Sequence, residues 1–266
     1  MSERCGITRE ARVMLGAAAA FSSTTEAGGA SVLRVPEAPS SPMVNRIVGL
    51  GVESPATEAH VDAALAAMGA GVTFYVAVAP GARPAELPEW LRARGLEPGW
   101  GWMAFRRDVG PLAPPASSLR LVEVHTAAHA HAFGRVVRIS YELPEAVEPR
   151  LARLHETGWR CWVAFDGDEP AGAGALFAAE RVAYLGFAGT LPAYRGKGAQ
   201  SALLAARLQA AEQLGCDVVV TETGERRGDR PSNSYRNILR AGFREMAITA
   251  NWVGRSTSGR DRPPAA

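Results

Sequence analysis

The chain has 266 residues, of which 47% are hydrophobic and 21% are charged, so it can form one large soluble domain or two modest ones. The formal net charge of +2 is nearly balanced and therefore does not indicate a nucleic-acid or anionic-membrane partner. The three cysteines (Cys5, Cys161 and Cys216) are odd in number and lack CxxC spacing, so we expect reduced thiols, with neither a disulfide framework nor a zinc site.

The first 108 residues alternate between helical and strand patterns. The segment 11–23 has an arginine before a short apolar run, as a weak signal peptide has. Glu3 and Glu10 precede it, and no apolar run approaches the roughly 20 residues that span a bilayer, so we expect a cytoplasmic protein. In chain order we expect a helix at 9–21, strands at 30–35 and 45–52, a helix at 58–69 capped by Thr57, a strand at 72–80, a short helix at 85–95 and a strand at 100–108.

A proline-rich stretch at 109–118, VGPLAPPASS, is typical of a linker and marks the expected domain boundary. The second half again alternates between strand and helix patterns. In chain order we expect a strand at 119–126, helices at 127–137 and 143–156, a hairpin at 161–178, a strand at 181–190, a helix from Ser201, a strand at 216–223, a helix at 232–243 and a strand at 246–253.

The segment 191–208, LPAYRGKGAQSALLAARL, combines a turn, two glycines and the start of a helix. Gly196 and Gly198 lack a Cβ, so the backbone can bend sharply and bring its N–H groups close to a bulky anion. The unpaired N–H groups and the positive dipole end of the following helix favour phosphate oxygens. Arg195 and Lys197 add positive charge, so the segment predicts a phosphate-binding loop.

Two other phosphate-binding motifs fit these residues less well. A Walker loop requires Gly, four residues and then Gly-Lys-Ser/Thr, but Leu191 occupies the first position and Gly198 follows the lysine. A dinucleotide fingerprint requires a third glycine where Ser201 stands. An exposed basic turn that merely begins a helix stays open as an alternative.

The remaining pattern, Arg/Gln-x-x-Gly-x-Gly/Ala, resembles the acyl-CoA pyrophosphate loop of the GNAT acetyltransferase superfamily. Arg195 and Gly198 match this pattern, whereas Gln200 replaces the last small residue. The order of strand, loop, helix, strand, helix ending in Gly-Phe and strand is also similar to the second half of GNAT proteins, and the resemblance covers about 119–253.

The resemblance implies an α/β (α+β) fold with a mixed central sheet flanked by helices. The first half has a similar element order, and VGLGVESPA and EWLRARGL resemble LGFAGTLPA and NILRAGF of the second half. We therefore expect two tandem GNAT-like domains: a degenerate GNAT-like or related α/β domain at 1–117, an acetyltransferase domain at 118–254 and a disordered tail at 255–266. The turn ESPATEAH of the first half lacks RGKG, so we expect no pyrophosphate there. An unrelated α/β domain of similar order stays open.

The function implied by the resemblance is transfer of an acetyl group from acetyl-CoA, a co-substrate, to the amine of an acceptor by direct attack in a ternary complex. In GNAT proteins the pantetheine arm lies along the fourth strand, and a backbone N–H there polarises the thioester carbonyl. The candidate cofactor-binding residues are Ala188, Gly189, Thr190, Arg195, Gly196, Lys197, Gly198, Ala199, Gln200, Ser201, Asn233 and Asn237.

The catalytic groups are less evident. YLGFAGT lacks the glutamate that many family members carry on the fourth strand, so Glu222 on the next strand is the candidate general base, with Thr190, a bound water or a merely solvent-facing Glu222 left open. Ile238 stands where the family usually has its general-acid tyrosine. Tyr235, one helical turn earlier on nearly the same face, is the candidate general acid, with plain packing as the alternative.

Three histidines stand near the start of the second half. His125 and His129 have four-residue spacing but no close carboxylate, so we expect no metal, and in a GNAT domain these histidines and His131 would instead line the acceptor pocket. The departures at Glu222 and Tyr235 leave a second function open, an acyl-CoA-binding regulatory or non-catalytic protein. As partners we expect acetyl-CoA and an amine, a small molecule rather than a protein, with no nucleic acid and no membrane, and a homodimer is left open.

Overall fold

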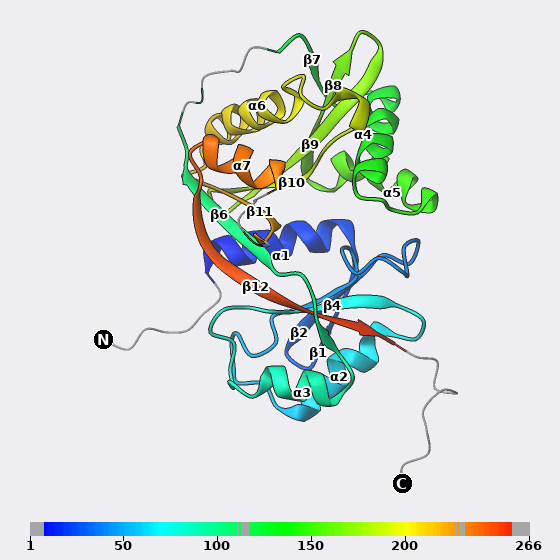
Figure 1. Ribbon diagram of the computed structural model, residues 1–266, viewed down its shortest axis with the longest axis vertical. Coiled ribbons are helices and arrows are strands. Elements are labelled where there is room, and N and C mark those ends of the chain that lie inside the picture. The colour runs from blue at the N-terminus through cyan, green and yellow to red at the C-terminus, as the bar shows by residue number, and fades with distance from the viewer. Residues whose placement is uncertain (1–7, 111, 113–116, 227, 229–231, 257–266) are drawn as a thin grey trace. The chain divides into compact units, whose positions relative to one another are not determined.

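The computed structural model describes residues 8–110, 112, 117–226, 228 and 232–256 (Figure 1). Cys5, part of the expected linker and all but two residues of the expected tail 255–266 lie outside the described residues. The described residues form two compact units: unit 1 comprises Thr8, Ser22–Trp102 and residues 248–256, and unit 2 comprises Arg9–Phe21 with Met103–Ala247.

Three elements fall differently from the expected ranges 1–117 and 118–254. Strand β6 (Trp102–Asp108) lies within the first range but belongs to unit 2 from Met103 onward. Helix α1 (Arg9–Phe21) belongs to unit 2, where Val13 packs on Val182. Strand β12 (Arg244–Arg255) contributes its first residues to unit 2 and its later ones to unit 1. Local patterns give no information on such assignments, because they depend on contacts between residues distant in the chain.

Unit 1 is a mixed sheet with the order β1-β2-β3-β4-β12, and β5 also pairs with β12. The pair β3–β4 is parallel, and the β1–β2, β2–β3 and β4–β12 pairs are antiparallel. Its core contains Val32, Ile47, Val61 and Met68, all of which are fully buried. The elements of unit 1 besides β12 are β1 (Ser23–Ala27), β2 (Ala30–Arg34), β3 (Arg46–Val48), α2 (Glu58–Met68), β4 (Thr73–Val78), α3 (Leu87–Ala93) and β5 (Glu97–Pro98).

Helix α2 begins and ends as the sequence predicts. The Thr57 hydroxyl accepts the His60 backbone N–H at 3.2 Å, and the His60 Nδ1 accepts the Thr57 N–H at 3.3 Å, which completes a capping box. Gly69, with a φ of 75°, ends the helix. The N-terminal donors of α2 are therefore partly satisfied by the side chains of the chain itself.

Unit 2 is a mixed sheet with the order β12-β6-β11-β10-β9-β8-β7. The pair β10–β11 is parallel, whereas β7–β8, β8–β9 and β9–β10 are antiparallel. The elements of unit 2 besides α1 and β12 are β6 (Trp102–Asp108), β7 (Arg120–Glu123), α4 (Ala127–Ser140), η1 (Glu145–Val147), α5 (Glu148–Ala152), η2 (Leu154–Thr157), β8 (Trp159–Asp166), β9 (Glu169–Ala179), β10 (Val182–Thr190), η3 (Pro192–Tyr194), α6 (Ala199–Gln213), β11 (Val218–Gly224) and α7 (Asn233–Arg240).

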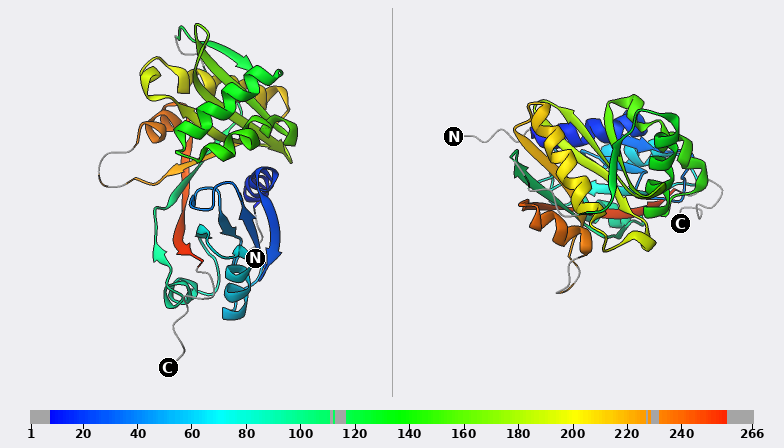
Figure 2. Two further views of the ribbon diagram at one scale, coloured as in Figure 1. Left: turned by 90° about the vertical axis from the view of Figure 1, so that its right-hand side faces the viewer. Right: turned by 90° about the horizontal axis from the view of Figure 1, so that it is seen from above.

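Helices cover both faces of the unit 2 sheet (Figures 1 and 2), with α6 and α4 on opposite faces. Alternate residues of β10 point to different faces. Ala183 and Leu185 pack with Leu203 of α6, whereas Val182 packs with Val13 of α1. These layers confirm the predicted mixed α/β fold class with helices on the sheet.

Three sequence-based expectations need correction. The expected helix 143–156 is three short pieces, η1, α5 and η2, because Pro149 begins a new helix and Gly158, with a φ of 90°, ends the last piece. Helix α6 starts at Ala199 and not at Ser201, since Gly198 already acts as its N-cap. The expected strand 45–52 is limited to β3, and its last residues form a turn.

No helix in the described part of the chain combines the length and the apolar character needed to cross a bilayer.

We predict that Thr57→Ala lowers the free energy of unfolding by about 1 kcal/mol, because it removes the side-chain acceptor of the capping box. Urea denaturation measures the change. Thr57→Ser, which keeps the hydroxyl, should retain the stability of the original protein, and equal losses in both variants would contradict this role of the cap.

Candidate active site

The predicted phosphate loop lies between β10 and α6. Gly198 is the N-cap of α6 in the left-handed conformation, with a φ of 81°, and no side chain caps the helix. The first intrahelical bond runs from the Ala202 N–H to the Gly198 carbonyl at 3.0 Å, so the N–H groups of 198–201 have no acceptor within the helix. Gly196, with a φ of 83°, has open space beside it. Backbone donors and the positive dipole end therefore occur together, as an anion requires.

The two basic residues of the loop are held differently. The Lys197 ammonium forms an ion pair with Asp166 at 2.5 Å and lies 5.3 Å from the centroid of the Tyr194 ring. Arg195 is exposed and forms no ion pair with any residue that the structure describes. Arg195 is thus the cation that an incoming phosphate would meet without competition, whereas Lys197 would have to leave Asp166.

Strands β10 and β11 stop pairing before either strand ends. Their register runs from Val182–Val218 to Leu185–Thr221, where the Thr221 hydroxyl donates to the Leu185 carbonyl at 2.8 Å. Beyond this point β10 continues to pair with β9 only, after a bulge between Gly186 and Gly189. Ala188, Gly189 and Thr190 therefore lie past the last β10–β11 pair, which is where a strand-like arm could be added.

The bulge of β10 contacts the end of α4. Phe187 has a φ of 48°, and a Cβ on Gly189 would stand 2.3 Å from the Ser140 Cβ and Oγ, so only glycine allows this approach. The Ser140 Oγ is buried and has no hydrogen-bond partner among the described residues. The C-terminal end of α4 therefore packs directly against the predicted pantetheine residues.

Tyr141 is the next residue in the chain, and the sequence did not indicate that it belongs to the site. Burial raises the pKa of Tyr141 to about 12, and a hydrogen bond donated by the Ala188 backbone N–H to its hydroxyl acts in the opposite direction. Its ring centroid lies 6.4 Å from that of Phe187. A tyrosine at the end of a predicted helix gives no sign of this contact, because the contact depends on how α4 crosses the sheet.

Glu222 stands on β11 just beyond the last β10–β11 pair. Its Oε1 accepts the Tyr184 hydroxyl at 3.1 Å, and the side chain is half-buried. The negative charge of this carboxylate also raises the pKa of Tyr141. A half-buried, hydrogen-bonded carboxylate beside the diverging strands differs from a freely solvated charge at a strand end.

Tyr235 is buried and its hydroxyl donates to the Glu245 carboxylate at 2.6 Å. Burial raises its pKa, and the hydrogen bond to Glu245 acts in the same direction. The Arg226 guanidinium lies 5.0 Å from the ring centroid, and the Phe105 ring packs edge-on at 4.8 Å. The hydroxyl proton of the predicted general acid is thus already held by a carboxylate.

The two predicted asparagines of α7 have different neighbours. Asn237 donates through Nδ2 to the Gln200 Oε1 at 2.7 Å, which joins α7 to the first turn of α6. The Asn233 side-chain oxygen accepts from Arg236. The residue that departs from the family pattern, Gln200, is therefore anchored by another predicted site residue.

Arg207 is a second residue that sequence reasoning missed, because it stands in an apolar helical pattern. Its side chain is buried and donates to the carbonyls of Leu203 and Ala175, at 3.0 and 3.3 Å. A Cβ on Gly174 would lie 2.9 Å from the guanidinium carbon, so Gly174 provides the space. Burial lowers the pKa of Arg207 to about 10, and the same residue lowers the pKa of Tyr141.

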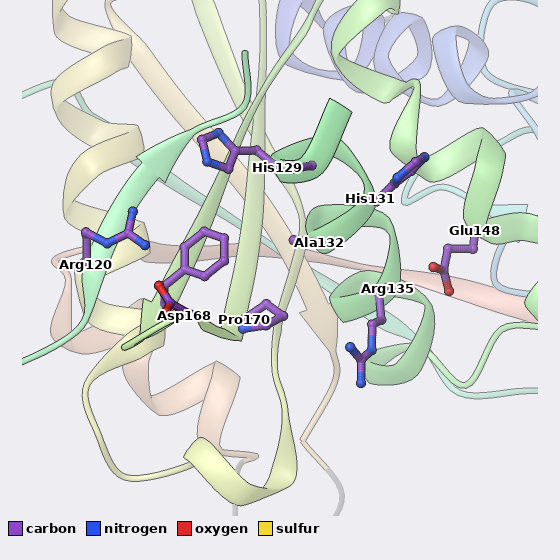
Figure 3. A pocket seen from close by; sticks show the side chains of 10 residues that line it. Arg120, His129, His131, Ala132, Arg135, Glu148, Asp168 and Pro170 are labelled. Carbon is purple, nitrogen blue, oxygen red and sulfur yellow. The ribbon is translucent and has the colours of Figure 1, made fainter. Parts of the chain in front are cut away.

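The three histidines do not form a metal centre. His125 is exposed, with Nε2 3.9 Å from Glu123, and the described residues contain no group of three or more side chains suited to a metal ion. His129 and His131 of α4 line a cavity of about 390 Å³ (Figure 3). A cavity of this size is sufficient for a small molecule.

Residues 130–230, a stretch within unit 2, match the family model for the acetyltransferase (GNAT) family. Curated protein sequences give no match. Among solved structures, the chain is similar to a GCN5-related N-acetyltransferase from Kribbella flavida, at 21% identity and a TM-score of 0.65, with 95% of this chain and 97% of that chain covered.

Two further structures have the same fold. One is a tandem GNAT protein from the clavulanic acid biosynthesis pathway, at 17% identity and a TM-score of 0.58, covering 86% of this chain and 79% of that one. The other is a GCN5-related N-acetyltransferase from Sphaerobacter thermophilus, at 16% identity and a TM-score of 0.58, covering 71% and 62%. The expected GNAT fold is thus confirmed over most of the chain.

We predict that Gly189→Ala destabilises the protein by about 1 to 3 kcal/mol, because the new methyl group overlaps Ser140. Urea denaturation of Gly189→Ala, Ser140→Gly and the double variant forms a double-mutant cycle. The double variant should be more stable than the sum of the single losses predicts, since Ser140→Gly vacates the space. Strict additivity would contradict the close approach.

Proposed function

We propose that the protein is an N-acetyltransferase that transfers an acetyl group from acetyl-CoA to an amine by direct attack in a ternary complex. One observation carries the proposal: a helix start with no side-chain cap and a left-handed glycine comes one short loop after a strand that has left its parallel neighbour. A pyrophosphate and an extended arm need these two features side by side. The GNAT-family match over residues 130–230 is consistent with it.

The cofactor residues have defined tasks in this proposal. The N–H groups of 198–201 bind the pyrophosphate, with Arg195 as the nearby cation. The edge of 188–190 that no longer pairs with β11 binds the pantetheine arm as an added strand would, once the Ala188 N–H exchanges its bond with Tyr141. Gln200, held by Asn237, presents the first turn of α6 in one orientation. Lys197 joins the site only when it leaves Asp166.

Glu222 is the proposed general base. Its carboxylate would take a proton from the acceptor amine, directly or through a water molecule, while Tyr184 holds its orientation. The proposed general acid, Tyr235, has to exchange its hydrogen bond with Glu245 before it can donate a proton to the leaving thiolate. Tyr141 contacts the predicted pantetheine strand directly, because its hydroxyl accepts a hydrogen bond from the Ala188 N–H.

A second function, acyl-CoA binding without catalysis, is favoured by that same contact. The N–H that would polarise a thioester carbonyl already has an acceptor in Tyr141. Incubation with acetyl-CoA and a panel of amines, with free thiol as the readout, separates the two functions. Thiol release that depends on an amine supports the transferase, whereas tight CoA binding without release supports the binding protein.

We propose the cytoplasm as the compartment, since acetyl-CoA is found there and Cys161 and Cys216 are both buried free thiols. A small-molecule acceptor and a homodimer remain part of the proposal as partners. Size-exclusion chromatography with light scattering tests the dimer directly.

Gly198→Val should weaken acetyl-CoA binding by more than about tenfold, because a β-branched residue resists the left-handed conformation and covers the N–H groups. Isothermal titration calorimetry measures the affinity. The matched control is Gly215→Val, which introduces the same backbone strain, at a φ of 70°, beyond the other end of α6. Unchanged affinity in Gly198→Val would remove the cofactor assignment.

Glu222→Gln should lower kcat by about 10²- to 10⁴-fold and remove the acidic limb of the pH–rate profile, since the amide cannot accept the proton. Its affinity for acetyl-CoA should stay unchanged, because the proposal gives Glu222 no contact with the pyrophosphate. Glu212→Gln, an exposed carboxylate on α6, is the control. A normal rate with a normal pH profile would exclude Glu222 as the base.

A further inference from the structure

The cavity lined by His129 and His131 is formed by β7, the first half of α4 and the β8–β9 hairpin (Figure 3). Arg120 and Arg135 line it together with the histidines. Arg120 places its guanidinium 4.9 Å from the centroid of the Phe165 ring, so one wall combines an aromatic face with a cation. Six of the ten lining residues are Arg, His, Asp or Glu, so their charges decide which ligands the pocket favours.

The charges of this pocket are unbalanced. Neither Arg120 nor Arg135 forms an ion pair within the described ranges. Of its two carboxylates, Glu148 is already bonded to Arg138 at 2.7 Å, which leaves Asp168 against two guanidinium groups. The His129 Nδ1 is buried and has no hydrogen-bond partner among the residues described. An anionic ligand would neutralise the excess positive charge, whereas a cation would be repelled.

The pocket shares helix α4 and strand β9 with the predicted pantetheine residues. Arg135 is five residues before Ser140 on the same helix, which corresponds to about 7.5 Å along α4. Pro170, which lines the pocket, stands two residues before Gly172, the pairing partner of Thr190, and this separation is about 7 Å along β9. Ser140 itself touches Gly189, so one helix connects the pocket with the pantetheine residues.

We propose that the acceptor is an amine that carries an anionic group several bonds from the nitrogen, and that the pocket of Arg120 and Arg135 binds this group. The inference rests on the proposed acetyl transfer and adds the acceptor class. Polyamines and lysine-rich peptides are poor acceptors under this proposal, because they bring positive charge to two unpaired guanidinium groups.

Three linear amines of equal length test the proposal: 6-aminohexanoate, its amide 6-aminohexanamide, and 1,6-diaminohexane. Calorimetric titration of the whole chain should give an affinity for 6-aminohexanoate that is about tenfold higher than for the amide, with the diamine weakest. 6-Aminohexyl phosphate extends the series and distinguishes a phosphate from a carboxylate. Equal affinities, or tightest binding of the diamine, would overturn the proposal.

The variants Arg120→Ala and Arg135→Ala should each lower the affinity for 6-aminohexanoate by about fivefold to tenfold and leave that for the amide unchanged. Both residues are exposed, so the fold should persist, and acetyl-CoA affinity checks this. Arg153→Ala, an exposed arginine paired with Glu156 outside the pocket, is the matched control. A loss that is the same for acid and amide would contradict binding of the anionic group.

The free thiol released from acetyl-CoA in the presence of the same amines distinguishes a failure of the proposed acetyl transfer from a failure of the proposed acceptor class. If 6-aminohexanoate binds through the two arginines but no thiol is released, acetyl transfer fails while the anion pocket stands. If the diamine is acetylated as fast as 6-aminohexanoate, the transferase stands and the acceptor class is wrong.

Discussion

The candidate site depends on one feature of the backbone: β10 stops pairing with β11 after Leu185 but stays paired with β9. A bulge with Phe187 at positive φ rotates the end of β10, so its main-chain groups no longer belong to two ladders. The same feature brings Gly189 against the end of α4 and directs the chain into the loop before α6. The cofactor loop, the predicted pantetheine edge and the contact of Tyr141 with Ala188 all follow from it.

Helices α2 and α6 begin in different ways, and the difference bears on anion binding. In α2, Thr57 and His60 satisfy each other's backbone donors, so little remains for an anion. In α6, Gly198 has no side chain and the first N–H groups stay available. This contrast is consistent with the hypothesis that the first half is a degenerate relative without a pyrophosphate site. The physical reason is that a helix start whose N–H groups are already bonded offers few donors to an anion.

Electrostatics around the site combine buried and exposed groups. Arg207 is buried at a cost in solvation, which two backbone carbonyls and the space at Gly174 partly offset. Tyr141 lies within the fields of both Arg207 and Glu222. Lys197 and Tyr235 are instead engaged with Asp166 and Glu245. A bound ligand would therefore have to compete with existing polar contacts at the loop and at α7.

The sequence by itself determined the fold class, nearly every element of unit 2 and the position of the loop, because periodicity, turns and glycines act through neighbouring residues. It also placed Glu222 on the strand after α6, where the structure has it. Only the tertiary structure decided the ion-pair and hydrogen-bond partners of the site residues: Asp166 for Lys197, Glu245 for Tyr235 and Ala188 for Tyr141. Such pairs join residues on different elements, so their geometry depends on how helices cross the sheet, which no local pattern encodes.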